Sequence, residues 1–190
     1  MILKLIEEIN KCLENNCYLV ALSSALTLPD ICGKAEYPNM KPSERYIKWY
    51  DEEIGQYENT ATGLQRGIPH ESGTVVYSLR NSLLHDGNPN INEKTCDIQE
   101  FELLVEGKNQ ANSYVGSAEI ERRYVDEEEV CVIRRLCINI RQLCFKLCIV
   151  AEHYYKNNKE KFGFINSKLT YVNPLARKLF DIKGEIVVEE

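Results

Sequence analysis

Residues 126–155 form the longest stretch of helical periodicity in this chain, and any fold must accommodate it. Apolar side chains recur there every three or four residues, which predicts an amphipathic α-helix. Asp126, followed by Glu129 three residues later, resembles a capping box in which Asp replaces Ser or Thr. The acids at 126–129 also suit the positive end of a helix dipole. We expect the longest helix to run from Asp126 to about Tyr155.

This predicted helix carries two apolar stripes, whereas a surface helix needs only one. The first stripe consists of Ile133, Leu136, Cys137, Ile140, Leu143, Cys144 and Leu147. The second, on the opposite side, consists of Cys131, Ile138, Phe145 and Ile149. We expect the helix either to be sandwiched within a helical bundle or to bury one side in a subunit interface.

The N-terminal region is predicted to form two helices. The first covers residues 2–13, where apolar side chains recur at helical spacing. The second covers residues 17–28 and is apolar on most of its surface, so we expect it to be buried. Pro29 cannot continue a helix, and residues 30–38 are therefore expected to form a loop with Gly33 as its pivot.

Two further helices are predicted in the middle of the chain. Ser43 can cap a third helix, which has an aromatic face. Residues 56–71 are polar and rich in Gly and Thr, which predicts a loop. Ser72 can cap a fourth helix over residues 73–86, and Gly87 is well placed to end it in the left-handed conformation.

A small β-hairpin is predicted after the fourth helix. Residues 98–105 alternate in part between apolar and polar side chains, and residues 112–118 offer a partner strand. The expected fold is thus mainly all-α. Residues 1–158 would form a helical bundle with the hairpin as an insertion at about 98–118, and residues 159–190 an irregular C-terminal extension.

The balance of charge limits the partners of the protein. The chain has 29 acidic and 23 basic residues, for a formal net charge of −6. Broad binding to duplex DNA is not expected of such a protein, although a local site for RNA stays open. No apolar run approaches the ~18 residues of a transmembrane helix. The charges of Lys4, Glu7 and Glu8 are unlike a signal peptide. We expect a cytoplasmic protein without a membrane partner.

Eight cysteines raise the question of disulfides or a metal. No C-x-x-C occurs, so the strong zinc signature is absent from the sequence. Cys144 and Cys148 are one helical turn apart, which leaves two interpretations, a shared soft metal or two small buried side chains. We favour reduced, packed thiols, and we predict no metal and no cofactor.

The most informative residues lie at the end of the fourth predicted helix. Arg80, Asn81 and His85 form the pattern R-N-x-x-x-H. On an α-helix Arg80 falls between Val76 and Leu84, inside the apolar arc. A guanidinium in that position must be paired, or must look into a cleft or a subunit interface. Ideal helical geometry separates Arg80 from His85 by about 140°, so they converge only if the last turn unwinds or if two copies meet across a dimer axis.

The helical bundle and this motif resemble the HEPN family (higher eukaryotes and prokaryotes nucleotide-binding domains). The family signature is Arg, a polar residue, three to five others and then His, and Arg80 to His85 match it with Asn81 at the polar position. The stretch from Leu28 to Gly33, LPDICG, is also similar to an uncharacterised bacterial branch of the family. The resemblance covers roughly residues 1–155.

The resemblance implies a metal-independent endoribonuclease that acts as a homodimer, often as a toxin or a defence component beside an antitoxin or a nucleotidyltransferase. His85 would move a proton at the ribose 2′-hydroxyl or the leaving 5′-oxygen, and Arg80 would hold the scissile phosphate. Both roles suit the side chains, because histidine titrates near neutral pH and arginine binds phosphate through two parallel hydrogen bonds. Asn81 would orient the imidazole or bind the ribose.

Three alternatives stay open on the sequence alone. A non-catalytic HEPN module would bind nucleotide, RNA or a partner protein through the same residues. Arg80 and His85 would make only an ion pair and a helix cap in a generic helical scaffold. Asp30 either supplies a carboxylate near the site or stabilises a turn.

For the other polar and aromatic candidates we favour a structural or solvent-exposed role over a functional one. His70 is expected in a solvated loop, and His153 at the end of the longest helix. Trp49 belongs more naturally to the core than to a base-stacking platform. The Arg122–Arg123 and Arg134–Arg135 pairs fit a mixed solvated surface better than a strip that guides RNA, because acids flank them.

Overall fold

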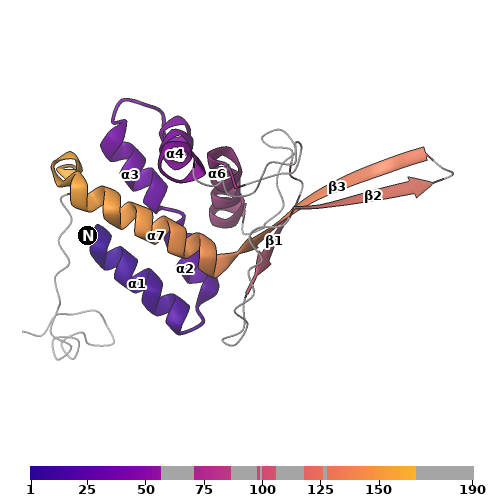
Figure 1. Cartoon of the computed structure of the whole chain (residues 1–190), viewed down its shortest axis with the longest axis horizontal. Coiled ribbons are helices and arrows are strands. Elements are labelled where there is room, and N and C mark those ends of the chain that lie inside the picture. Colours follow the sequence, from indigo (N-terminus) through magenta and orange to yellow (C-terminus); the bar gives the residue numbers. More distant parts are fainter. Residues whose placement is uncertain (57–70, 87–97, 99, 106–117, 126–127, 166–190) are drawn as a thin grey trace, which may run out of the picture.

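The computed structural model describes residues 1–56, 71–86, 98, 100–105, 118–125 and 128–165. These residues form a mainly helical body with a small sheet, as predicted (Figure 1). The helical elements are α1 (Ile2–Glu14), α2 (Tyr18–Ala25), α3 (Leu28–Glu36), α4 (Pro42–Tyr50), η1 (Asp51–Gly55), α6 (Gly73–Asn81), η2 (Ser82–Asp86), α7 (Ile140–Asn157) and η3 (Lys159–Phe162). The strands are β1 (Glu100–Leu104), β2 (Ala118–Val125) and β3 (Glu128–Asn139). No helix in these ranges is long and apolar enough to cross a membrane.

The first N-terminal helix confirms the prediction from periodicity, whereas the second, α2, is shorter than predicted and only partly buried, since Leu19 and Val20 are exposed. On α1, the apolar side chains at helical spacing, Ile2, Ile6, Ile9 and Leu13, are all buried. On α2, Ala21, Leu22 and Ala25 are buried. Both helices pack against α7, which crosses the body with α1 and α2 on one side and α3 on the other (Figure 1). This burial removes apolar surface from water and is the main favourable term in forming the bundle.

The predicted loop at residues 30–38 is wrong, because residues up to Glu36 form helix α3. Pro29 lies in the first turn of this helix, where its missing N–H has no intrahelical partner to lose. Gly33 is not a pivot but a packing site. A Cβ there would lie 2.7 Å from the Arg45 carbonyl oxygen, so the glycine lets the backbone of α4 approach α3 closely.

Helix α4 contributes the largest buried side chains of the body. Tyr46, Trp49 and Tyr50 are all 0% exposed, which places these aromatics in the core, as the sequence favoured. The helix begins one residue before Ser43, with Pro42 in its first turn, so Ser43 is not its cap. Its far end continues into the π-helical turn η1.

Helix α6 begins as predicted. The Ser72 side chain caps it by accepting a hydrogen bond from the Val75 N–H, at 3.4 Å. Gly73 allows close packing on α4, because a Cβ there would lie 2.5 Å from the Ile47 carbonyl oxygen. The Gly73 N–H also donates to Asp51 Oδ1 at 2.6 Å. Gly87, the predicted end of the helix, and the loop at 57–70 lie outside the described residues.

The predicted helix over 126–155 is correct only in its second half. Helix α7 starts at Ile140, and its N-cap is Asn139, whose side chain accepts from the Gln142 N–H at 3.1 Å. Residues 128–139 form the strand β3, so Glu129 does not belong to a capping box. The run VCVIRRLCI at 130–138 is rich in β-branched side chains, which favour a strand, and this preference prevails over the helical spacing.

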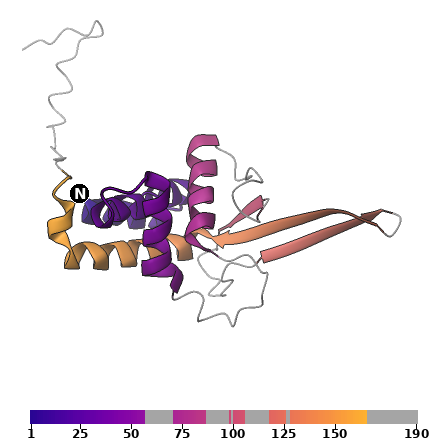
Figure 2. The same cartoon turned by 90° about the horizontal axis from the view of Figure 1, so that it is seen from above.

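The sheet has the order β1-β3-β2. β1 pairs with β3 in parallel, from Glu100 opposite Arg135 to Leu104 opposite Asn139, and β2 pairs with β3 antiparallel. Of the predicted hairpin, the first segment contains β1, which pairs with β3, and the last residue of the second segment, Ala118, begins β2 on the far side of β3. The rest of the second segment, residues 112–117, lies outside the described residues. Figures 1 and 2 show the β2–β3 ribbon projecting away from the helices.

The two apolar stripes predicted on the longest helix differ in burial. Members of the first, including Leu143, Cys144 and Leu147, are buried in the core. Two members of the second, Phe145 and Ile149, are 63% and 48% exposed. One side of α7 thus packs within the bundle and the other keeps an apolar surface in solvent.

The folded body continues past the end of α7. Phe162, in η3, is 5% exposed and packs edge-on against Tyr154 and Tyr155. The C-terminal extension predicted to start at 159 thus begins with a segment that packs on the body. Residues 166–190 lie outside the described residues.

Candidate functional site

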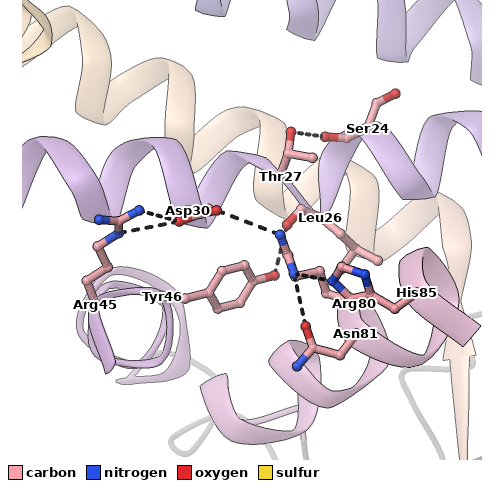
Figure 3. Close-up of polar contacts among 9 residues, drawn as sticks. All are labelled: Ser24, Leu26, Thr27, Asp30, Arg45, Tyr46, Arg80, Asn81 and His85. Atoms are coloured by element: carbon pink, nitrogen blue, oxygen red, sulfur yellow. Dashed lines mark hydrogen bonds and ion pairs between the residues drawn. The ribbon is translucent and has the colours of Figure 1, made fainter. Parts of the chain in front are cut away.

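The structure brings Arg80 and His85 together within one chain. Helix α6 ends at Asn81, and residues 82–86 form the single π-helical turn η2. Because a π-turn has i→i+5 hydrogen bonds and more residues per turn than an α-helix, it brings residue i+5 closer to the side of residue i. His85 Nε2 consequently lies 3.4 Å from Arg80 Nη1 (Figure 3). The separation expected on an ideal α-helix does not occur, since the last turn widens.

Neighbouring side chains hold Arg80 in place, but not all of its N–H donors have a hydrogen-bond partner among the described residues. Its Nη1 donates to Asn81 Oδ1 at 2.9 Å, and its guanidinium carbon lies 5.9 Å from the centre of the Tyr77 ring. The Arg80 side chain is 20% exposed. Its Nε is buried and has no hydrogen-bond partner among the described residues. The buried Nε cannot reach solvent, but the contacts of the terminal nitrogens to His85 (3.4 Å) and Asp30 (3.8 Å) are long, so these nitrogens are the donors that an anion could engage.

Asp30 connects Arg80 to a second arginine. Its Oδ1 accepts from Arg45 Nη2 at 3.0 Å and from Arg45 Nε at 3.4 Å, while its Oδ2 lies 3.8 Å from Arg80 Nη2 (Figure 3). The helices α3, α4 and α6 each supply one member of this Arg45–Asp30–Arg80 triad. Asp30 lies within helix α3, so the predicted turn-stabilising role does not apply. Its shorter contacts are with Arg45, and its contact with Arg80 is the longer one.

A buried tyrosine forms the wall behind the triad. Tyr46 donates its hydroxyl to the Leu26 carbonyl at 3.1 Å, and its ring packs edge-on against Tyr77 with centres 5.1 Å apart. Burial raises the pKa of Tyr46 far above its usual range, and the nearby Arg80 offsets only part of this effect. The residue therefore acts as a neutral donor that fixes the junction between α2 and α3.

Taken together, these residues define a small cationic site. Two guanidinium groups outnumber the single carboxylate, while the exposed imidazole of His85 can carry a proton. A phosphate group fits this charge, because Arg80 can donate two hydrogen bonds to its oxygens. The arrangement can bind a phosphodiester and move a proton beside it.

The remaining candidates do not join this site. His153 is exposed on α7, where its Nε2 lies 2.9 Å from Asn157 Nδ2. Arg135 pairs with Glu100 across the sheet at 3.0 Å. His70 and the side chains of Arg122, Arg123 and Arg134 lie outside the described part of the chain.

A second polar cluster lies around the far end of α3, where a cleft of about 300 Å³ opens. It is lined by Glu36, Tyr37, Glu52, Glu53, His153, Tyr154, Asn157, Asn158 and Lys161. Lys161 Nζ lies 2.5 Å from Glu36 Oε2, and the Tyr154 hydroxyl also donates to that carboxylate. These two hydrogen bonds lower the pKa of Glu36, whereas burial and the neighbouring acids raise the pKa of Glu53.

The cysteines whose side chains are described are free thiols. Cys144 and Cys148 are buried in the core, and burial raises the pKa of each to about 12. Within the described ranges, no group of three or more His, Cys, Asp or Glu residues is placed to hold a metal ion. The two thiols are packed side chains of α7.

Sequence reasoning found four site residues and missed Arg45. No local pattern links Asp30 to a residue fifteen positions later. One usable signal was Gly33, since an isolated glycine within a helix often marks the close approach of another backbone, here that of Arg45 itself. Pro29 hides this signal, because it predicts a loop over residues 30–38 in place of a helix.

The described residues form a mainly helical protein with a small three-stranded sheet and an Arg–Asp–Arg triad beside an exposed histidine. Comparisons of the chain with models of protein families, with curated proteins and with solved structures found no match.

Proposed function

We propose that this chain is a HEPN-like, metal-independent endoribonuclease acting on cytoplasmic RNA. The observation that carries the proposal is the π-turn η2, which sets His85 Nε2 at 3.4 Å from Arg80 Nη1. A phosphate-binding guanidinium and a proton-carrying imidazole then flank one point at the edge of solvent. The resemblance of the R-N-x-x-x-H motif to the HEPN signature supports the same conclusion.

The chemistry needs only groups that the RNA and the protein supply. The ribose 2′-oxygen attacks the adjacent phosphorus and the bond from phosphorus to the 5′-oxygen breaks, which leaves a 2′,3′-cyclic phosphate and a free 5′-hydroxyl. Because the nucleophile belongs to the substrate, no metal-bound water is required. Arg80 binds the phosphate and stabilises its growing charge, His85 moves a proton, and Asn81 holds Arg80 in place.

The test is cleavage of a mixed-sequence RNA in excess EDTA. We expect the wild type to produce cyclic-phosphate ends and to leave a DNA strand of the same sequence intact. His85→Ala should cut about 10²- to 10⁴-fold more slowly, as loss of a proton-transfer group does. His153→Ala is the matched control, because His153 is also exposed but lies in the other polar cluster. Equal cutting by wild type and His85→Ala would instead indicate a contaminating nuclease.

The alternative function is a non-catalytic HEPN module that binds nucleotide, RNA or a partner protein. The Arg45–Asp30–Arg80 triad favours this alternative. Its two arginines, both paired with Asp30, can bind a phosphate without any proton transfer. The same assay separates the two. A binding module would retain RNA on a filter in both wild type and His85→Ala, with no products from either.

A homodimer is part of the proposal. The helices α2 and α7 pack on each other, and each leaves large apolar side chains in solvent. These are Leu19 and Val20 on α2, and Phe145 and Ile149 on α7. We expect Phe145→Glu to lower the mass measured by sedimentation equilibrium from that of a dimer to that of a monomer. Val105→Glu, a substitution at another exposed apolar residue, should leave it unchanged.

The biological setting follows from the chemistry. An RNA-cutting enzyme without control is toxic, so an antitoxin or a nucleotidyltransferase partner is proposed to restrain it, in a toxin–antitoxin pair or a defence system. Expression of the wild type should arrest growth, and His85→Ala should relieve the arrest. Arrest by both proteins would show that toxicity does not come from this site.

A further inference from the structure

We propose that Asp30 is the general base and His85 the general acid of this RNA cleavage, and that both act within one chain. This assignment rests on the proposed function and adds to it the role of each proton carrier. It departs from a mechanism in which two copies of His85 meet across a dimer axis. The inference follows from how Asp30 and His85 flank Arg80.

The two proton carriers contact different terminal nitrogens of the Arg80 guanidinium, and Nη1 also donates to Asn81. Asp30 Oδ2 lies 3.8 Å from Nη2, and His85 Nε2 lies 3.4 Å from Nη1, on the opposite side of the group (Figure 3). A phosphate bound to this guanidinium would have the carboxylate at one flank and the imidazole at the other. In-line transfer at phosphorus requires this placement, because the attacking and leaving oxygens lie roughly opposite each other.

Asp30 has one oxygen to spare for the reaction. Arg45 occupies Oδ1 through two hydrogen bonds and so fixes the carboxylate plane. Among the described residues, Oδ2 has only the longer ion pair to Arg80. The Asp30 side chain is 30% exposed, and we assign Oδ2, the oxygen that Arg45 does not occupy, to a hydroxyl group of the substrate.

The chemistry of the two groups decides which is base and which is acid. A carboxylate is ionised at neutral pH and can only accept a proton, whereas an imidazole can carry one and give it up. Without substrate, His85 Nε2 faces a guanidinium that only donates, so this nitrogen is then an acceptor. A phosphate oxygen only accepts, so a phosphate that takes over Arg80 favours a protonated Nε2 beside it.

Asp30 Oδ2 removes the 2′-hydroxyl proton while the 2′-oxygen forms its bond to phosphorus. The bond from phosphorus to the 5′-oxygen breaks, and this oxygen takes the proton from His85 Nε2. Arg80 holds the non-bridging oxygens throughout. Both side chains reach their starting state again when a proton passes from Asp30 to His85 through solvent.

The two roles can be told apart with an RNA whose scissile 5′-oxygen is replaced by sulfur. A thiolate leaves without being protonated, so this substrate needs a base but no acid. We would measure cleavage of the oxygen and sulfur substrates by wild type, Asp30→Asn and His85→Ala. Glu44→Gln serves as the control for loss of one carboxylate, since Glu44 is exposed on α4 next to Arg45.

We expect His85→Ala to cut the oxygen substrate at least 100-fold more slowly and the sulfur substrate within about threefold of wild type. Asp30→Asn should be at least 100-fold slower on both, while circular dichroism at the assay temperature shows that the variant is still folded. Rescue of Asp30→Asn by sulfur, failure to rescue His85→Ala, or wild-type rates in Asp30→Asn would each overturn the assignment. Wild type that cuts neither substrate would overturn the proposed function together with it.

A mixing experiment tests whether both groups act within one chain. Asp30→Asn and His85→Ala proteins are unfolded together and refolded, so that any dimer can contain both. If the base and the acid belong to one chain, the mixture cuts no faster than the two variants measured separately. Recovery to a quarter or more of the wild-type rate would show that the two groups come from different chains, and would overturn this part of the proposal.

Discussion

The two polar clusters at the two ends of α3 are built from similar residues and carry opposite charge. At the first end, Asp30 lies between two arginines, and His85 lies against one of them, Arg80. At the second end, Glu36 lies with two further acids and His153 around a cleft. Each cluster thus contains a histidine, but the first combines it with two arginines and one carboxylate, and the second with one lysine and three carboxylates. Charge balance, more than the presence of a histidine, decides which end suits a phosphate.

The comparison also shows how each histidine is set. The imidazole of His85 faces a guanidinium because a π-turn brings residue i+5 beside Arg80. The imidazole of His153 lies on a regular α-helix beside Asn157, four residues later. The local winding of the helix therefore determines which histidine can act together with an arginine.

The largest difference in RNA cleavage between the two clusters should appear when each loses a cation. Arg80→Ala is expected to lower kcat/KM for RNA cleavage about 10²- to 10³-fold, because it deletes the donors that stabilise the charged transition state. Lys161→Ala, which removes the cation of the acidic cluster, should leave kcat/KM unchanged. Steady-state cleavage of a labelled RNA measures both. Equal losses would mean that the two clusters do not differ in function.

A smaller effect is expected on stability when Asp30 loses its main partner. Arg45→Gln leaves the partly buried carboxylate with the longer contact to Arg80, and we expect the free energy of unfolding to fall by about 2 kcal/mol. Lys48→Gln on the same helix breaks an exposed pair with Glu52, at 3.9 Å, and should cost under about 0.5 kcal/mol. Urea denaturation measures both free energies of unfolding. A similar loss in Arg45→Gln and Lys48→Gln would mean that the Arg45–Asp30 pair is as exposed to solvent as the Lys48–Glu52 pair.

Packing between the clusters can be tested at Gly33. Gly33→Ala adds a Cβ that would meet the Arg45 carbonyl oxygen at 2.7 Å, so α3 and α4 must move apart. We expect a loss of about 1–2 kcal/mol after the gain in helix propensity is subtracted. Gly163→Ala has its nearest such contact at 3.9 Å and should not destabilise the protein. Stability unchanged in Gly33→Ala would show that the two helices pack less closely than described.

The smallest effects concern the acidic cluster and depend on pH. The pKa of Glu53 is raised above 4.5, so its ionised form opposes folding at neutral pH. Glu53→Gln should therefore stabilise the protein by about 0.5 kcal/mol at pH 7, and the gain should vanish as the pH falls below 4.5. The value is small because solvent screens these carboxylates.

Glu36 should behave in the opposite way. Its pKa is lowered below 4.5 by the hydrogen bonds from Lys161 and Tyr154, so its ionised form stabilises the fold above that pH and the contribution is lost on acidification through the folded-state pKa. Glu36→Gln should therefore destabilise at pH 7 by about 0.5 kcal/mol and have no effect in strong acid. Thermal unfolding between pH 3 and pH 7 would reveal the opposite signs, and the same sign for both variants would contradict the description of this cleft.

Much of the helical body could be predicted from local sequence. The buried stripe of α1, the Ser72 cap of α6 and the buried aromatics of α4 all follow from residue type and spacing. The strand β3 could not, because its apolar residues satisfy a helical and an extended pattern equally well. Its inner end is buried, with Leu136 and Ile138 both 0% exposed, so contacts with the rest of the body decide the outcome.

The amino-acid sequence by itself determined the helical faces, the net charge and the presence of Arg80, Asn81 and His85 near one helix end. These depend on neighbours within a few residues, where periodicity is physically meaningful. Only the tertiary structure decided that the last turn widens to bring His85 onto Arg80, and that Asp30 lies between Arg80 and Arg45. An extra residue in a turn and an ion pair across three helices depend on the packing energy of the whole body, which no local pattern contains.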